Sequence, residues 1–164
     1  MKINTSIHTG IIILILMLSY SCAGFKNFSR KNIKCLMKCS NEQNISLRIK
    51  CLSNAINKNP TYSEYYSLRG YAYKELMKFT SAIQDFRKVI ELEPGNVEAY
   101  YCLATAASLA RHKRYALYWL QRSYEAGFED YQLIETDKSL DNLRDMDEFN
   151  ALLKKWYQKS VSLN

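Results

Sequence analysis

The chain has 164 residues, 48% of them hydrophobic, and its 23 basic and 16 acidic side chains give a formal charge of +7. This length suggests a single domain, and only five glycines and two prolines argue against a protein built of strands and turns. Despite the positive charge we expect no nucleic-acid partner, because the Lys and Arg residues are not interleaved with a recognisable nucleic-acid motif.

The first 24 residues have the pattern of an export signal. Lys2 gives a positive start, and an unbroken apolar run over 11–18 is followed by small residues. The run is too short to cross a bilayer, which requires about 20 residues in a helix. We therefore expect residues 1–24 to direct export, with an uncleaved N-terminal anchor as the alternative.

The segment from Leu18 to Gly24 resembles the lipobox of bacterial lipoproteins, in which the cysteine after the signal receives a diacylglyceryl group and becomes the mature N-terminus. Ser19 stands where that family has leucine, and Leu18 lies one residue further out. The resemblance implies lipid attachment at Cys22 and a membrane-anchored lipoprotein, on the periplasmic face or in the outer membrane. Ordinary cleavage after Ser21 or Ala23 would instead give a soluble periplasmic or secreted protein.

Charge is unevenly distributed along the rest of the chain. Residues 23–62 carry eight basic groups against Glu42, whereas residues 125–164 carry nine acidic groups and five basic ones. The basic part lies next to the proposed anchor, where an anionic surface would attract it. The alternative is that these basic side chains lie on a helical face that is exposed to water and binds nothing.

Three cysteines suggest a disulfide in the first part of the chain. Cys35 and Cys39 are four residues apart and share one helix face. Export favours oxidation, so a bridge from Cys35 or Cys39 to Cys51 would join two helices. Buried free thiols are the alternative. Zinc is not indicated, because no paired CxxC and no nearby histidine complete a ligand set.

A repeat with a period of about 34 residues organises the chain from residue 29 to 130. Pro60 and Pro94 stand one such period apart, and apolar residues recur at the same interval: Ile49, Ile83 and Leu117, and Leu52, Phe86 and Leu120. Such a period, with helical spacing of apolar residues, is typical of a helical solenoid. We expect helix pairs in 29–62, 63–96 and 97–130.

Local signals place the ends of these helices. Ser63 and Asn96 are suitable N-caps for the first helices of the second and third pairs. Gly70 would let the second helix of its pair approach closely, and Gly127 would end the third pair.

The second pair resembles the tetratricopeptide repeat (TPR) family, through Tyr66, Gly70, Tyr73, Ala82, Phe86, Val89 and Pro94, with Arg69 where leucine is usual. The third pair shares Tyr100, Leu103, Ala104, Ala116, Leu120 and Ser123, and the first is degenerate. The resemblance implies an all-α fold, a right-handed superhelical solenoid of three helix hairpins over 25–130. It also implies a C-terminal helical cap over 131–164, whose apolar residues would cover the last repeat.

In that family the first helices line a concave groove that binds a partner. The resemblance places six residues of this chain in the groove: Arg30, Lys34, Tyr71, Lys74, Tyr101 and Thr105. Tyr71 and Tyr101 are the strongest candidate anchors, because aromatic side chains dominate interface energetics. The positions where some members grip a C-terminal carboxylate hold Ile33, Met37 and Leu68, so a carboxylate clamp is not supported.

No pattern in the chain indicates catalysis. His112 is the only histidine after the signal and falls in a turn, and there is no Gly-rich phosphate loop and no HExxH motif. We therefore expect no enzyme, cofactor or metal site. We predict a scaffold or adaptor of a bacterial envelope that binds a peptide or protein. The alternatives are a structural or surface-charge protein and a non-catalytic subunit of an envelope enzyme complex.

Overall fold

The computed structural model describes residues 30–162, and residues 35–162 belong to one compact unit. The helices are α2 (Arg30–Ser40), α3 (Ile45–Lys58), α4 (Ser63–Glu75), α5 (Phe79–Leu92), α6 (Val97–Leu109), α7 (Lys113–Glu125), α8 (Tyr131–Thr136), the 3-10 helix η2 (Lys138–Leu143) and α9 (Asp147–Ser162). Strands are absent from this range, and the predicted all-α fold is confirmed. The expected signal and the lipid attachment at Cys22 lie outside the described residues.

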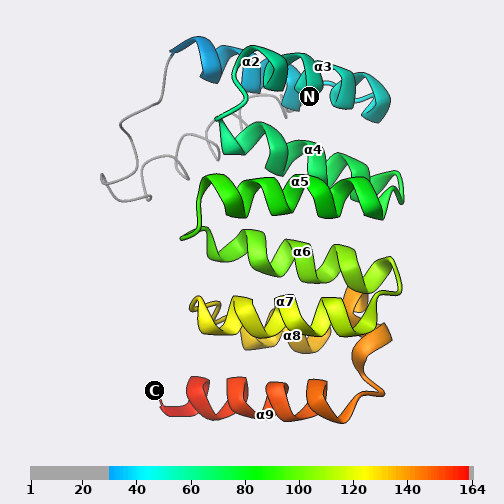
Figure 1. Ribbon diagram of the computed structural model, residues 1–164, viewed down its shortest axis with the longest axis vertical. Coiled ribbons are helices and arrows are strands. Elements are labelled where there is room, and N and C mark those ends of the chain that lie inside the picture. The colour runs from blue at the N-terminus through cyan, green and yellow to red at the C-terminus, as the bar shows by residue number, and fades with distance from the viewer. Residues whose placement is uncertain (1–29, 163–164) are drawn as a thin grey trace, which may run out of the picture. The chain divides into compact units, whose positions relative to one another are not determined.

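The helices from α3 to α9 follow one another as a stack (Figure 1). Ile45, Phe79, Lys113 and Asp147 begin α3, α5, α7 and α9, each one period of the sequence repeat after the last. The intervening helices α4, α6 and α8 begin at residues 63, 97 and 131, with the same interval. The period therefore continues through the C-terminal segment, where the first helix is broken into α8 and η2.

The end of α4 shows how the turns inside the helix pairs are built. The amide of Met77 donates to Lys74 O at 2.9 Å and that of Lys78 donates to Tyr73 O at 2.8 Å, the two bonds of a Schellman motif. Met77 has a φ of 55°, and Arg111, one period later, has a φ of 64° in the same arrangement. Gly127, with a φ of 98°, occupies this position after α7.

The two expected N-caps differ in outcome. Asn96 caps α6, because its Oδ1 accepts from the amide of Ala99 at 3.1 Å. The prediction for Ser63 is wrong: α4 begins at Ser63 itself, after the N-cap residue Tyr62. The Ser63 hydroxyl instead donates to Glu93 Oε1 at 2.5 Å, which ties the start of α4 to the end of α5.

Close packing within the second pair depends on Gly70. A Cβ atom at this position would lie 2.9 Å from Cε1 and Cζ of the Phe86 ring, closer than real contacts allow. Phe86 is 1% exposed and packs among Ala82, Leu103 and Ala106. The expected close approach of α5 to α4 at Gly70 is confirmed.

A disulfide joins Cys39 of α2 to Cys51 of α3, with their Cα atoms 5.5 Å apart. Cys35, the alternative partner from the sequence, is a free thiol of intermediate exposure. Cys39 is fully buried with Leu52 and Ala55, so the bridge lies inside the hydrophobic cluster of the first helix pair.

Arg69 stands where the repeat pattern has leucine, and its charge is matched inside the stack. The guanidinium donates to Asp85 on α5 through Nε at 2.8 Å and Nη2 at 2.7 Å, and to Ser53 Oγ on α3 at 3.0 Å. It also lies over the rings of Tyr66 and Tyr73, with its Cζ atom 5.7 and 5.8 Å from the ring centroids. Asp85 is 4% exposed and Arg69 is half-buried, so the guanidinium links α4 to α5 and α3 at a largely buried position.

Candidate functional site

Tyr71 on α4 is the centre of the accessible part of the predicted groove. Its hydroxyl donates to Glu98 Oε1 at 2.7 Å and lies 2.9 Å from Cys102 Sγ, so it bridges α4 to α6. Its ring packs edge-on against Phe86, with the centroids 5.3 Å apart. Burial, with additional effects from Cys102 and Glu98, raises the pKa of the Tyr71 hydroxyl, so it stays protonated and acts as a donor.

A small pocket of about 80 Å³ opens beside Tyr71. Polar side chains gather at it: Glu64, Ser67, Asn96 and Glu98. Cys102 also lines the pocket, and burial raises the pKa of its thiol to about 11, so it remains a neutral thiol. The pocket offers hydrogen-bonding groups and the aromatic rings of Tyr71 and Phe86, without a reactive nucleophile.

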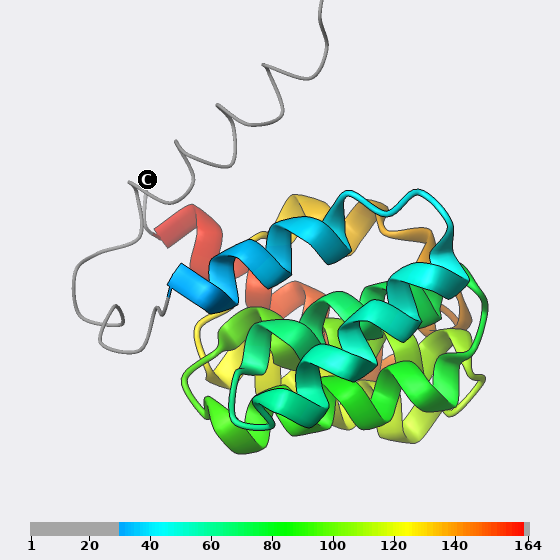
Figure 2. The same cartoon turned by 90° about the horizontal axis from the view of Figure 1, so that it is seen from above.

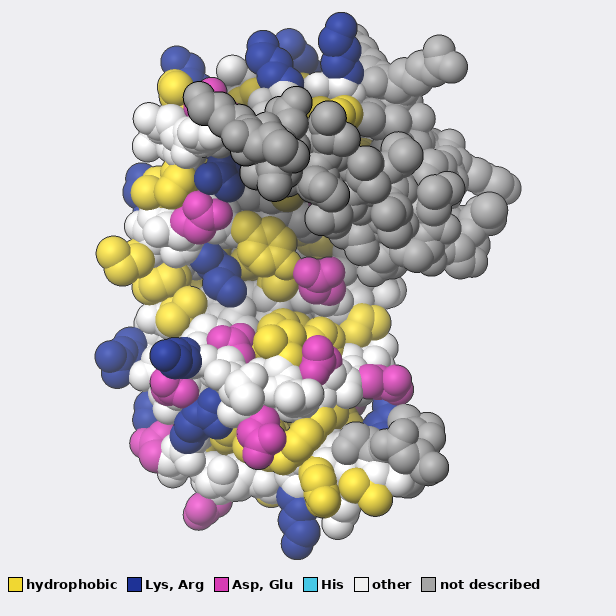
Figure 3. Space-filling view, turned by 180° about the vertical axis from the view of Figure 1, so that it is seen from behind, with side chains coloured by type: hydrophobic (Ala, Val, Ile, Leu, Met, Phe, Trp, Pro, Cys, Tyr) yellow, Lys and Arg dark blue, Asp and Glu magenta, His cyan; other side chains and the backbone are white. Residues whose placement is uncertain are grey.

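Hydrophobic, acidic and basic side chains alternate in small patches on the face of the molecule shown in Figure 3. Obligate protein–protein interfaces bury more extended apolar surfaces than this mixed one.

Lys74 and Thr105, two further predicted groove residues, contact each other. Lys74 Nζ donates to Thr105 Oγ1 at 2.8 Å, and Thr105 Oγ1 donates to the carbonyl of Cys102 at 3.0 Å. Thr105 is only 1% exposed, so it presents almost no surface to a ligand. Lys74 is the more accessible member of the pair.

Tyr101, the second expected anchor, is 7% exposed and is fully engaged within the protein. Its ring stacks on Phe128 with the centroids 4.5 Å apart and an interplanar angle of 9°. Its hydroxyl donates to Asp137 Oδ2 at 2.5 Å. Tyr101 therefore fastens the C-terminal segment to α6.

Asp137 is held as a carboxylate at the junction of α8 and η2. Burial raises the pKa of Asp137, but hydrogen bonds from Tyr101 and Ser139 and the nearby Lys74 outweigh it, so the pKa lies below its ordinary value. Ser139 supplies two of these bonds to Asp137 Oδ1, from its amide at 2.8 Å and its hydroxyl at 2.7 Å.

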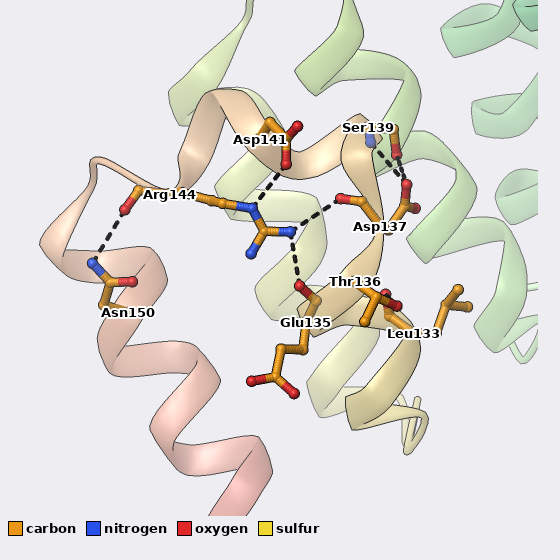
Figure 4. Close-up of polar contacts among 8 residues, drawn as sticks. All are labelled: Leu133, Glu135, Thr136, Asp137, Ser139, Asp141, Arg144 and Asn150. Carbon is orange, nitrogen blue, oxygen red and sulfur yellow. Dashed lines mark hydrogen bonds and ion pairs between the residues drawn. The ribbon is translucent and has the colours of Figure 1, made fainter.

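Arg144 fixes the bend that follows α8 (Figure 4). Its Nη2 donates to the carbonyl of Glu135 at 2.8 Å and to that of Asp137 at 3.3 Å, and its Nε donates to Asp141 Oδ1 at 2.8 Å. At the other end, Asn142 Nδ2 donates to the carbonyl of Ser108 on α6 at 2.8 Å. Through these contacts η2 packs against α6, and Figure 2 shows the stack from above, with α8 and η2 in gold and orange.

The structure thus brings Tyr71, Lys74, Tyr101 and Thr105 together around α6, but only Tyr71 and Lys74 keep accessible surface. Lys34 is exposed and belongs to the other compact unit, and the side chain of Arg30 lies outside the described part of the chain. Sequence reasoning did not identify Asp137 and Asn142 as contacts of α6. They lie 36 and 34 residues from Tyr101 and Ser108, close to one period, which is the signal that would have found them.

The described residues form neither a metal site nor a membrane-spanning helix. Within 30–162 no group of three or more His, Cys, Asp and Glu side chains is arranged to hold a metal ion. In the same range no helix combines the length and apolar character needed to cross a membrane. His112 is the exposed N-cap residue of α7.

Comparison with known proteins relates this fold to a repeat family. Residues 63–96 match the family model described as tetratricopeptide repeat. The crystal structure of MamA aligns with a TM-score of 0.60 at 20% identity, over 84% of this chain and 76% of that one. The TPR2B domain of yeast Sti1, in a complex with pHsp70, aligns with a TM-score of 0.56 at 25% identity, over 80% of this chain and 99% of that one.

A curated relative shares only a short stretch. Sixty-nine residues, 42% of this chain, are 38% identical to the UDP-N-acetylglucosamine--peptide N-acetylglucosaminyltransferase of Giardia intestinalis, but they cover 4% of that protein. The similarity is therefore local. The predicted TPR resemblance is confirmed for residues 63–96, and the fold is that of TPR solenoids.

Proposed function

We propose that this TPR solenoid is a protein-interaction scaffold that binds an extended segment of a partner in the groove between α4 and α6. The fold supports this function, because solenoids of stacked helix pairs typically offer extended concave binding surfaces. The likeness to the TPR2B domain of Sti1, whose structure contains pHsp70, also supports a peptide ligand.

The accessible surface around Tyr71 carries the proposal. Tyr71 supplies a ring fixed against Phe86, which makes it a rigid anchor with little conformational entropy to lose on binding. The pocket beside it supplies polar groups from Glu64 and Ser67 for a peptide backbone or side chain. Met37 and Leu68 are apolar residues at positions where some TPR proteins have side chains that grip a C-terminal carboxylate. The expected ligand is therefore an internal segment of a chain and not a free C-terminus.

A pair of matched substitutions tests the groove. Ser67→Arg places a long charged side chain in the pocket, whereas Thr80→Arg makes the same kind of change at an exposed position on α5. Each variant is crosslinked in its native cells, purified, and its partners are quantified by mass spectrometry. We expect Ser67→Arg to lose a partner that the wild type and Thr80→Arg both retain.

Equal recovery of every partner by both variants would contradict groove binding. It would favour the alternative of an envelope protein that acts through its surface without a groove ligand. Co-purification with a catalytic chain that is insensitive to Ser67→Arg would favour a subunit of an enzyme complex. We expect no catalytic activity from the chain alone, since TPR folds typically act as interaction scaffolds and Cys102 is a buried neutral thiol.

The envelope location is the second part of the proposal, and it depends on Cys22. The lipobox-like segment supports a diacylglyceryl anchor at this residue. Labelled palmitate should be incorporated into the wild type and not into Cys22→Ala. Equal labelling of both, or of neither, would contradict the anchor but would leave the groove proposal standing.

A further inference from the structure

The outer side of α7 carries an exposed aromatic cluster. Tyr115 and Tyr118 are 36% and 54% exposed. Both rings lie edge-on to Trp119, with centroid distances of 6.0 and 5.2 Å, and Trp119 also contacts Tyr100 at 5.9 Å. The two tyrosines are thus held in place by a ring beneath them while their outer surfaces face solvent.

The same side of α7 is positively charged. Arg114 on α7 and Arg111 in the turn before it are exposed, and no carboxylate of the described residues forms a salt bridge with either of them. Two neighbouring cations are already matched, because Arg122 pairs with Glu125 at 2.8 Å and Lys113 pairs with Asp145 at 2.7 Å. The sequence has no Asp or Glu from 99 to 124, so neither unmatched arginine has an acidic residue within ten positions along the chain.

The fold does not require these side chains. One period earlier, on α5, the residues that correspond to Arg114, Tyr115 and Tyr118 are small or neutral: Thr80, Ser81 and Gln84. Thr80 and Gln84 are exposed as well. The same position in the same helix pair therefore accepts polar residues, and the aromatic and basic character of α7 calls for another explanation.

We propose that Arg111, Arg114, Tyr115 and Tyr118, here called the α7 face, rest on the surface of an anionic phospholipid membrane. Tyrosine and tryptophan rings suit the boundary between headgroups and acyl chains, since each has an apolar body and a polar tip. Unpaired arginines are attracted to anionic headgroups. The charge of the face is complementary to that surface.

Two other partners fit the α7 face less well. A nucleic acid is bound through many phosphate contacts, commonly about six to ten, and this face has two unmatched cations. A stable protein interface buries about 800 Å² on each partner, but the corresponding surface of the neighbouring α5 is polar and neutral at Thr80, Ser81 and Gln84. A narrow aromatic and basic strip on one helix is sufficient for contact with a lipid surface.

The α7 face goes beyond the proposed groove function and does not depend on Cys22. If the lipid anchor is present, the face would act as a second membrane signal, and two signals hold a protein at a membrane far better than one chain. A test without the anchor therefore separates the two proposals.

The test uses the full chain with Cys22→Ala, so that no lipid can be attached, and with Trp156→Phe. Trp119 is then the only tryptophan, because the chain has two. Its fluorescence is measured with vesicles of phosphatidylcholine, with or without phosphatidylglycerol, whose acyl chains carry bromine as a short-range quencher. This readout reports the position of α7 itself, so an N-terminal segment that binds the vesicle elsewhere does not produce it.

We expect quenching of Trp119 by the anionic vesicles and about tenfold weaker apparent binding to neutral ones. The variant Arg114→Thr/Tyr115→Ser/Tyr118→Gln, which carries the residues of α5, should lose the quenching while keeping the helical circular dichroism of the wild type. The matched control Lys58→Thr, an exposed charge on α3, should keep it.

Two results would overturn the proposal. One is a Trp119 signal that neither vesicle type quenches. The other is quenching that is the same with neutral and anionic vesicles and is unchanged by the triple substitution. Binding to single-stranded nucleic acid that requires the α7 face, without quenching by anionic vesicles, would assign the face to a different partner.

Discussion

At Gly70 a single methyl group decides how closely α5 can approach α4. Because a Cβ atom would lie 2.9 Å from two atoms of the Phe86 ring, Gly70→Ala should lower the free energy of unfolding by about 1–3 kcal/mol, as overpacked cores do. Gly95→Ala is the control, since its Cβ would meet nothing within 4 Å. Urea unfolding of both variants checks this, and equal stabilities would contradict it.

Met77 holds a left-handed backbone conformation that disfavours residues with a side chain. Met77→Gly should therefore raise the free energy of unfolding, by about 1 kcal/mol. Arg111→Gly should behave in the same way, because Arg111 has the same conformation one period later. Thermal unfolding measures both. Gly127→Ala, at a φ of 98°, should instead lower the free energy of unfolding. A loss of stability in Met77→Gly or Arg111→Gly, or a gain in Gly127→Ala, would contradict this explanation.

Asp137 gives the protein a specific response to acid. Its pKa is lowered in the folded state, so the stabilisation from its carboxylate is complete above the unfolded pKa of about 3.9 and is lost as pH falls through the folded pKa. Tyr101→Phe removes one donor and should raise the pKa of Asp137, as followed by NMR titration of its carboxyl carbon. Tyr71→Phe, on α4, should leave that pKa unchanged.

Some individual residues could be assigned from sequence and others could not. Gly70 and Asn96 were predictable because their roles depend on neighbours within one helix pair. The burial of Tyr101 and Thr105 was not, because it depends on a segment about one period further along the chain folding over α6. Ser63 has the chemistry of an N-cap, but Glu93 offers its hydroxyl a stronger, charged acceptor.

At the scale of the helices, the Arg69–Asp85 pair replaces an apolar contact between α4 and α5. Arg69→Leu restores the residue usual in the repeat but leaves a buried carboxylate without its partner. We expect it to cost about 3–5 kcal/mol of unfolding free energy, in line with other broken buried ion pairs. The double variant Arg69→Leu/Asp85→Ala should recover most of this loss in chemical unfolding. No recovery would mean that the cost arises elsewhere.

The C-terminal helices show the limit of a pattern-based prediction. The resemblance to TPR proteins correctly implied helices that cover the last repeat, since Leu140, Leu143, Phe149 and Trp156 are all buried there. The break between α8 and η2 was not predictable, because it is fixed by Arg144 donating to two backbone carbonyls and by Tyr101 reaching across to Asp137. The bonds of Arg144 leave no periodic trace in the sequence. Tyr101 and Asp137 lie 36 residues apart, close to one period, and this interval signals their contact but not the break in the helix.

At the scale of the described stack, the spacing of Pro60 and Pro94 is repeated by the helices. The starts of α3, α5, α7 and α9 keep that interval, even though the sequence pattern fades after residue 130. Each pair needs a neighbour to cover its apolar face, so the geometry of the stack persists where individual signature residues do not. The period thus predicts architecture better than it predicts which groove positions remain open to a ligand.

Photo-crosslinking, which maps where a partner contacts the protein, tests the groove proposal most directly. A photoreactive phenylalanine analogue is introduced in native cells at Ser67, in the pocket, and separately at Thr80, on the outer side of α5. We predict that one partner protein is captured from position 67 and not from position 80. Capture of the same proteins from both positions, or of a partner from position 80 alone, would contradict a scaffold that binds through its groove.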